Sequence, residues 1–135
     1  MNRAVPGASV ETLSRVPLFE ELDQTELESL AASMHEANVP AGAVVAAEGG
    51  PGDGFFVIDS GEAEVTVAGE PRGTMQAGDY FGEIALLMGS DRTATVTATS
   101  ALRCYALTPW DFRRLVEEHP TIAWKVLQSM AARLA

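Results

Sequence analysis

The feature that most constrains the fold is a series of short apolar segments, separated by turn-forming residues, in the middle of the chain. Residues 62–67, 93–98 and 101–107 alternate between apolar and polar side chains, which is the period of a half-buried β-strand. Residues 43–47 and 55–58 add two shorter apolar runs. Strands spaced by about 8–12 residues, with turns between them, are typical of a β-sandwich or a small barrel. The sequence therefore predicts a mainly β core of the jelly-roll kind.

Helical patterns flank this β region, first on its N-terminal side. Ser9 is positioned to cap a short helix, which ends at a proline followed by two apolar anchors in residues 17–19. Asp23 and Glu26 then have the spacing of a capping box, in which each residue satisfies a backbone N–H of the other at a helix N-terminus. The apolar side chains that follow on one helical face are expected in the core; they are Leu27, Leu30 and Met34.

Two more helices are predicted after the β region. Thr108 and Pro109 form an N-cap followed by proline at the first helical position, and the pair His119 and Pro120 ends that helix. The second helix covers residues 121–134 and carries an apolar stripe. The stripe consists of Trp124, Leu127, Met130, Ala131 and Leu134. It packs either on its own domain or on a partner, such as a second copy of the chain.

The length and charge of the chain limit its function. With 135 residues we expect one domain over residues 9–135, preceded by a flexible arm at residues 1–8. The formal net charge of −10 makes a nucleic acid or an anionic membrane a poor partner, and no apolar run is long enough to span a bilayer. The single cysteine, Cys104, excludes an internal disulfide and indicates the reducing cytoplasm.

One stretch carries the chemistry of a binding site. Phe81 and Gly82 open it, six residues able to form one or two helical turns follow, and Arg92 stands before the next strand. A glycine lets the backbone approach a ligand, and the N–H groups of a helix's first turn attract an anion. An arginine offers a cationic fork to a phosphate, while the carboxylate of Glu83 accepts hydrogen bonds from a diol. Together these groups predict a site for a sugar phosphate.

This stretch resembles the phosphate-binding cassette of the cyclic nucleotide-binding domain family. The family pattern is roughly F-G-E-[LI]-A-L, a short gap, and then P-R-x-A-[ST]-V. Residues 81–86, Arg92 and residues 94–96 fall on it. The chain departs from it at Asp91, where the family usually has proline, and this places a negative charge beside the expected phosphate site.

Two further blocks match the family in the same order, at residues 48–65 and at residues 78–79. The resemblance therefore covers nearly the whole chain from Val16 onward. It implies an α+β fold, mainly β, built as an eight-stranded jelly-roll β-barrel or sandwich with N-terminal helices, a short phosphate-cassette helix and two C-terminal helices. The expected parts are a helical bundle at 9–36, a β-roll at 37–107 with its cassette at 81–94, and C-terminal helices at 108–135.

The resemblance also implies a set of ligand-binding residues. Arg92 would bind the phosphate, Glu83 the ribose 2′-hydroxyl, and Val65 would supply an apolar wall for ribose and purine. The remaining implied residues come from the cassette and are Phe81, Gly82, Ile84, Ala85, Thr93 and Ala94. Structural roles stay open at three positions: a strand-end charge for Arg92, a helix-dipole partner for Glu83, and ordinary core for Val65.

The identity of the base and of its cap stays open. The hydroxyl of Thr93 contacts either the cyclic phosphate or, as in some family members, the exocyclic amine of guanine. Cyclic AMP is the expected ligand, with cyclic GMP as the alternative and no further cofactor. The family often caps the base from its last helix, where Trp124, Leu127 and Arg133 are candidates.

The sequence thus predicts a regulatory module in which nucleotide binding rearranges the C-terminal helices, with a protein partner or a second copy through the last helix. It does not predict an enzyme, because it holds no Ser-His-Asp signature, Walker-type loop or dinucleotide fingerprint. His35 and His119 also lack the spacing of metal ligands.

Three alternatives remain open. The domain keeps the fold but binds no nucleotide and serves in protein interaction, or it is the regulatory fragment of a larger enzyme, channel or transporter. A small cupin-like enzyme is the third, and it requires a cluster of His and Glu metal ligands.

Overall fold

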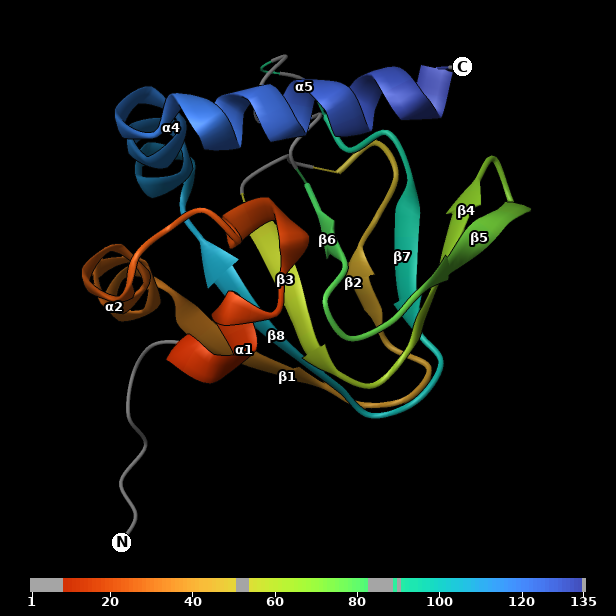
Figure 1. Cartoon of the computed structure of the whole chain (residues 1–135). Helices are drawn as coiled ribbons and strands as arrows, with labels where there is room; N and C mark the ends of the chain where they lie inside the picture. Colours follow the sequence, from red (N-terminus) through yellow and green to blue (C-terminus); the bar gives the residue numbers. More distant parts are fainter. Residues whose placement is uncertain (1–8, 51–53, 83–88, 90, 135) are drawn as a thin grey trace, which may run out of the picture.

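The computed structural model describes residues 9–50, 54–82, 89 and 91–134 of the chain. Its strands form two four-stranded antiparallel sheets that pack as a β-sandwich, with helices beside and above them (Figure 1). The predicted eight-stranded, mainly β fold with helices at both ends is confirmed, and it has the sandwich form. The expected arm at residues 1–8 and the cassette helix at 83–88 lie outside the described residues.

The first sheet has the strand order β1-β8-β3-β6 and the second the order β2-β7-β4-β5. The strands of the first sheet are β1 (His35–Val39), β8 (Leu102–Leu107), β3 (Phe55–Ser60) and β6 (Tyr80–Phe81). Those of the second are β2 (Val44–Ala46), β7 (Thr95–Ala98), β4 (Ala63–Val67) and β5 (Glu70–Met75). The neighbouring strands of the second sheet pair antiparallel. Strands β2 and β5 lie at its two edges.

Helices flank the strands in the chain, and three of them begin directly after the predicted caps Ser9, Asp23 and Thr108. Those before the sandwich are α1 (Val10–Ser14), the 3-10 helix η1 (Pro17–Phe19) and α2 (Gln24–Ser33). Those after it are α4 (Pro109–Glu118) and α5 (Pro120–Leu134). Both halves of the capping box are present, because Asp23 accepts from the Glu26 N–H at 2.8 Å and Glu26 from the Asp23 N–H at 2.9 Å. Thr108 accepts from the Asp111 N–H at 3.2 Å.

The period-two alternation of the strands builds two separate cores. Phe55 and Val57 of β3 face the helices, in a cluster that also contains Phe112 of α4 and Val126 of α5. Ile58 faces the other way, into the space between the two sheets. The central strands β3 and β8 of the first sheet are therefore largely buried on both faces, whereas β1 at its edge is mostly exposed and the second sheet has one face toward solvent.

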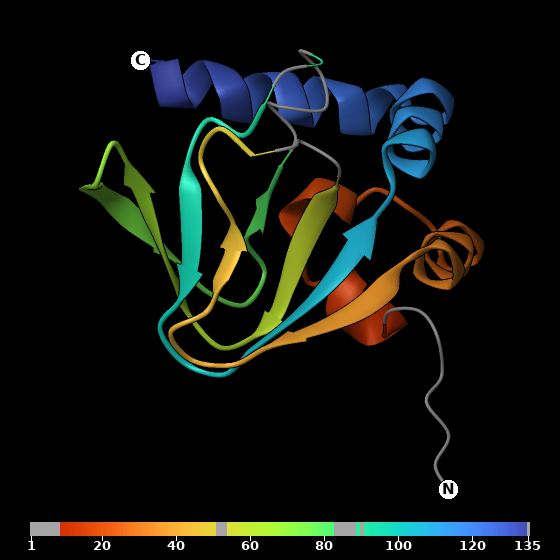
Figure 2. The ribbon, with the colours of Figure 1, turned by 180° about the vertical axis from the view of Figure 1, so that it is seen from behind.

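The last helix, α5, crosses the upper end of the sandwich, as both ribbon views show (Figures 1 and 2). Its inward face is set by Ile122 and Val126, which are 1% exposed, and by Met130, which packs against the same core. Trp124 and Leu127, two members of the stripe that was expected to pack on its own domain or on a partner, do not pack in the core and are 62% and 55% exposed. Spacing alone did not choose between two overlapping apolar faces of this helix.

Two strands extend into segments that are rich in turn-forming residues. Strand β5 contains Pro71 and Gly73, and it pairs with β4 through its backbone at a solvent-exposed edge, so it needs no apolar alternation. Strand β3 continues through Ser60, which pairs with Arg103 of β8.

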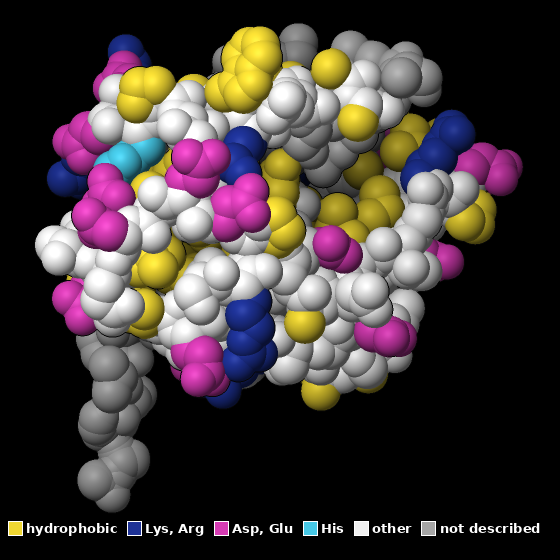
Figure 3. All heavy atoms as spheres, viewed as in Figure 1, with side chains coloured by type: hydrophobic (Ala, Val, Ile, Leu, Met, Phe, Trp, Pro, Cys, Tyr) yellow, Lys and Arg dark blue, Asp and Glu magenta, His cyan; other side chains and the backbone are white. Residues whose placement is uncertain are grey.

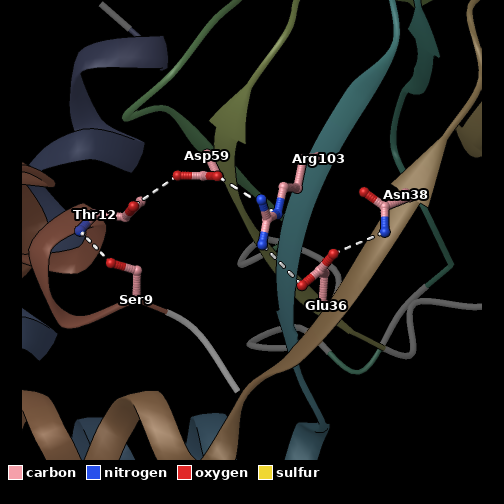
Figure 4. A network of polar contacts seen from close by, with 6 residues as sticks. All are labelled: Ser9, Thr12, Glu36, Asn38, Asp59 and Arg103. Carbon is pink, nitrogen blue, oxygen red and sulfur yellow. Dashed lines mark hydrogen bonds and ion pairs between the residues drawn. The ribbon is translucent and has the colours of Figure 1, made fainter. Parts of the chain in front are cut away.

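A polar network fastens α1 to the outer face of the first sheet (Figure 4). The Thr12 hydroxyl donates to Asp59 at 2.6 Å, and the Arg103 guanidinium lies 3.7 Å from Asp59 and 3.0 Å from Glu36. A hydrogen bond from Asn38 and the contacts of Arg103 lower the pKa of Glu36. The network is largely exposed, so it fixes the position of α1 more than it adds stability.

Candidate functional site

A cavity of about 530 Å³ opens at the second sheet. Its lining comes from five strands and from the segments on either side of the undescribed residues; the lining residues are Ala46, Val65, Val67, Arg72, Gly73, Thr74, Met75, Phe81, Gly82, Arg92, Thr93, Ala94 and Val96. Figure 3 shows a hollow with hydrophobic side chains on its wall, between α5 and the β4–β5 hairpin. The volume suits a ligand of a few hundred daltons.

Arg92 is the one buried charged residue among those that the structure describes, with 7% of its surface exposed. Its Nη2 donates to the carbonyl oxygen of Gly54 at 3.0 Å, and its guanidinium lies 5.6 Å from the ring centroid of Phe56. The backbone is held as well: the Arg92 N–H donates to Gly50 at 2.8 Å and the Gly49 N–H donates to Arg92 at 2.9 Å. A guanidinium held in this way is already oriented before a ligand arrives.

Gly82 is required by the close approach of Arg92. Its φ of +102° lies in the region that favours glycine. A Cβ at this position would lie 2.3 Å from the carbonyl oxygen of Gly54 and 2.7 Å from Nη1 of Arg92. The backbone of Gly82 therefore forms one side of the niche that holds the guanidinium.

The rest of the cavity is mainly apolar. Val65 and Val67 of β4 line it, and Phe81 stacks on Phe56 with ring centroids 5.0 Å apart and an angle of 9°. Among the described residues of the lining, the charged ones are Arg92 and Arg72, and none is Asp or Glu. A local positive site therefore exists in a chain whose net charge is −10, which favours an anionic ligand with an apolar part.

The structure brings together most of the residues that the sequence singled out. Six of them line the one cavity: Val65, Phe81, Gly82, Arg92, Thr93 and Ala94. Glu83, Ile84 and Ala85 lie outside the described residues. The candidate caps Trp124 and Leu127 do not line the cavity, and the side chain of Arg133 is not among those described.

The sequence reasoning missed several lining residues. They are Ala46, Arg72, Gly73, Thr74, Met75 and Val96, and the four consecutive ones belong to β5. The available signal was Arg72, a basic residue between Pro71 and Gly73 in a segment without apolar alternation.

Other reactive groups lie away from the cavity. Burial between the sheets raises the pKa of the Cys104 thiol from its ordinary 9.0 to about 11, which makes it a poor nucleophile. His119 Nδ1 lies 3.2 Å from Glu26. Within the described ranges, no group of three or more His, Cys, Asp or Glu residues is placed to hold a metal ion. None of the described helices combines the length and hydropathy needed to cross a membrane.

Comparison with known proteins identifies the fold family. The family model described as the cyclic nucleotide-binding domain matches residues 36–119, which is more than half of the chain. The chain belongs to the cyclic nucleotide-binding domain family. All the described residues that line the cavity lie within the matched range.

Relatives of the domain include regulatory subunits and channels. The cAMP-dependent protein kinase regulatory subunit of Yarrowia lipolytica is 42% identical over 106 residues, which cover 77% of this chain and 28% of that protein. The cyclic nucleotide-gated potassium channel RHE_CH03180 of Rhizobium etli is 33% identical over 123 residues, which cover 91% of this chain and 34% of that protein. The chain thus spans roughly a quarter to a third of the length of these relatives.

Solved structures show the same fold. The cAMP-bound structure of PfPKA-R (141–441) matches with a TM-score of 0.79 and 30% identity, over 83% of this chain and 39% of that chain. The regulatory domain of Toxoplasma gondii PKA, crystallised with cAMP, matches with a TM-score of 0.81 and 26% identity, over 92% of this chain and 48% of that chain.

Proposed function

We propose that this domain is a regulatory module that binds cyclic AMP in the cavity at the second sheet. The observation that carries the proposal is Arg92, a buried guanidinium held beside the Gly82 backbone in a cavity that is otherwise mainly apolar. A buried arginine at one end matches a phosphate, and an apolar wall matches ribose and purine. The relatives with cyclic AMP in their names or structures support the same ligand.

In this proposal Arg92 binds the cyclic phosphate, and Gly82 permits its close approach to the backbone. Glu83 accepts from the ribose 2′-hydroxyl, and Ile84 and Ala85 contribute backbone N–H groups to the phosphate. The cavity wall is supplied by Val65, Phe81, Thr93 and Ala94.

Binding would be coupled to the C-terminal helices through β3. Arg92 donates to the carbonyl of Gly54, and the next residue, Phe55, stacks on Phe112 of α4 with ring centroids 4.8 Å apart. A ligand that pulls the guanidinium toward its phosphate therefore acts on the backbone beside Phe55, whose ring stacks on α4. The regulatory output is a shift between two packings of α4 and α5.

The domain acts in this proposal by binding, with the nucleotide as its only small-molecule partner and with no enzymatic step. Its output goes to a protein, either another segment of a longer chain or a separate partner in the cytoplasm. The exposed side chains of Trp124 and Leu127 on α5 favour a protein contact at that helix. They also favour the second candidate function, a protein-interaction domain that does not bind a nucleotide.

The experiment that tests the proposal is calorimetric titration of Arg92 variants with cyclic AMP. Removing a charge-assisted bond to a phosphate costs about 2–3 kcal/mol, so Arg92→Ala should weaken binding by about 30- to 150-fold. Arg92→Lys keeps the charge but loses the bidentate guanidinium, so its affinity for cyclic AMP should lie between those of the wild-type chain and Arg92→Ala. Arg113→Ala is the control, because Arg113 is exposed on α4, pairs with Glu117 and does not line the cavity.

Circular dichroism spectra of each variant serve as the control that the fold is retained. Undiminished affinity in a folded Arg92→Ala variant would remove Arg92 from the phosphate site. Equal loss in Arg92→Ala and Arg113→Ala would show that only the net charge matters.

A further inference from the structure

The cavity wall that comes from β4 and β5 is attached to its sheet over only part of its length. Strand β4 pairs with β7 from Ala63 to Thr66, and the described pairings beyond Thr66 join it to β5 alone. Strand β5 lies at the edge of the second sheet, and in both ribbon views the β4–β5 hairpin projects from the side of the sandwich (Figures 1 and 2). A two-stranded hairpin is marginally stable alone, so its outer part needs another support.

The turn at the tip of the hairpin leaves one backbone donor outside the strand ladder. The ladder ends where Val67 pairs with Glu70, so the turn consists of Ala68 and Gly69. Both have a positive φ, +53° and +80°, as a type I′ turn requires. Ala68 is the one non-glycine residue with a positive φ in the described part of the chain. Its N–H group must find an acceptor outside the ladder.

Glu48 supplies that acceptor from the segment that follows β2. The Ala68 N–H donates to Oε1 of Glu48 at 2.8 Å. The N–H of Glu48 itself donates to Oγ1 of Thr95 at 3.0 Å, and Thr95 is the β7 residue that pairs with Thr66. Glu48 therefore continues the attachment of the hairpin at the point where its pairing with β7 stops.

The segment that carries Glu48 is also fixed to the other side of the cavity. The Gly49 N–H donates to the carbonyl oxygen of Arg92 at 2.9 Å, and the Arg92 N–H donates to the carbonyl oxygen of Gly50 at 2.8 Å. Residues 48–50 thus join the tip of the hairpin, through one side chain, to the backbone of Arg92, through two main-chain bonds. They set the spacing between the apolar wall and the buried guanidinium, which line the same cavity.

We propose that Glu48 is a positioning residue for nucleotide binding. Its carboxylate holds the β4–β5 hairpin so that Val65 and Val67 meet a ligand whose phosphate lies at Arg92. The inference rests on the proposed function, because it takes the ligand to span these two sides of the cavity. Glu48 is not among the lining residues, so it acts through the hairpin and does not touch the ligand.

The charge and the hydrogen bond of Glu48 act on affinity in opposite directions. A carboxylate near an anionic ligand repels it, so a change that removes only the charge should strengthen binding or leave it unchanged. A change that removes the acceptor frees the hairpin tip and should weaken binding. The sign of the effect therefore separates the positioning of the hairpin from simple electrostatics.

The test is calorimetric titration of the wild-type chain, Glu48→Ala and Glu48→Gln with cyclic AMP. Glu48 is exposed, so its replacement should leave the fold intact. Glu48→Ala should weaken binding about three- to tenfold, which is the effect of one lost hydrogen bond. Glu48→Gln keeps an amide oxygen that can accept from Ala68, so its affinity should stay within about twofold of the wild-type value.

Two control variants isolate charge and stability. Glu70→Ala removes the same charge from an exposed position on the same hairpin, outside the cavity lining, and should not weaken binding. Gly42→Ala places a side chain where φ is +90°, far from the hairpin in the chain and outside the cavity lining. It should lower stability without changing the affinity, because a loss of stability alone does not move the hairpin.

The inference fails if Glu48→Ala binds cyclic AMP as tightly as the wild-type chain or more tightly. It also fails if Glu48→Gln loses as much affinity as Glu48→Ala, because an acceptor at this position then does not restore binding. Equal losses in Glu70→Ala or Gly42→Ala would assign the effect to charge or to stability. If the wild-type chain does not bind cyclic AMP, the proposed function fails as well, whereas binding that depends on Arg92 but not on Glu48 refutes this inference alone.

Discussion

Replacing Gly82 by alanine tests the packing that places the buried guanidinium. The new Cβ would lie 2.3 Å from the Gly54 oxygen and 2.7 Å from Nη1 of Arg92, well inside van der Waals contact. The first neighbour is backbone, so the strand must move. Overpacking of this kind costs about 1–3 kcal/mol, and the φ of +102° adds about 1–2 kcal/mol for a residue with a side chain.

A matched control separates these two contributions. Gly42 has a φ of +90°, but a Cβ there would meet nothing within 4 Å, and Gly42 does not line the cavity. Gly42→Ala should therefore lose only the conformational part, about 1–2 kcal/mol, whereas Gly82→Ala should lose about 2–5 kcal/mol in total.

The assay is urea denaturation followed by circular dichroism, which gives the free energy of unfolding of both variants and of the wild-type chain. Calorimetry on the folded Gly82→Ala variant should also show weaker binding of cyclic AMP, because the guanidinium is displaced. Losses of stability that agree within about 0.5 kcal/mol for the two variants would refute the close packing of Gly82 against Gly54 and Arg92.

Two further predictions concern the core and the last helix. Burial raises the pKa of the Cys104 thiol from 9.0 to about 11. Between these two pH values the unfolded chain loses a proton that the native state keeps. The free energy of unfolding should therefore fall by about 2–3 kcal/mol as the pH rises from 9.0 to about 11. Urea denaturation across this pH range should show that Cys104→Ala lacks this loss; an identical pH dependence would contradict the shifted pKa. Lys125 of α5 donates to the Pro17 carbonyl at 3.3 Å and contacts Glu20. Lys125→Met should lower the free energy of unfolding by about 1 kcal/mol at low salt and by less at high salt, and it should speed amide hydrogen exchange in α5. Unchanged exchange would show that the contacts of Lys125 do not hold α5 against η1.

The caps and strands predicted from the sequence depend on local signals that the tertiary structure does not override. Asp23 and Glu26 form the capping box from side chains three residues apart, and Thr108 caps α4 in the same local way. The apolar run of β8 was also enough to predict a strand, but the structure buries both of its faces, one against the helices and the other against the second sheet, where the alternation had predicted a half-buried strand.

The parts that the sequence did not reveal depend on neighbours far along the chain. Strand β5 is stabilised by backbone pairing with β4 at an exposed edge, so its side chains carry no burial pattern. Arg72 enters the cavity only because the register shifts opposite Val65, which no single-sequence pattern records. The orientation of α5 was similarly ambiguous, since only the packed structure chooses Ile122 and Val126 over Trp124 and Leu127 for the core.

The most direct measurement of the central claim is calorimetric titration of the wild-type chain with cyclic AMP, after a check that no nucleotide has co-purified. The account predicts saturable one-to-one binding, and it predicts that the affinity falls about 30- to 150-fold in Arg92→Ala while circular dichroism stays unchanged. A folded chain that shows neither heat nor ligand-induced NMR shifts at residues lining the cavity would contradict it, and would leave the exposed side chains of α5 as the basis of a protein-interaction function.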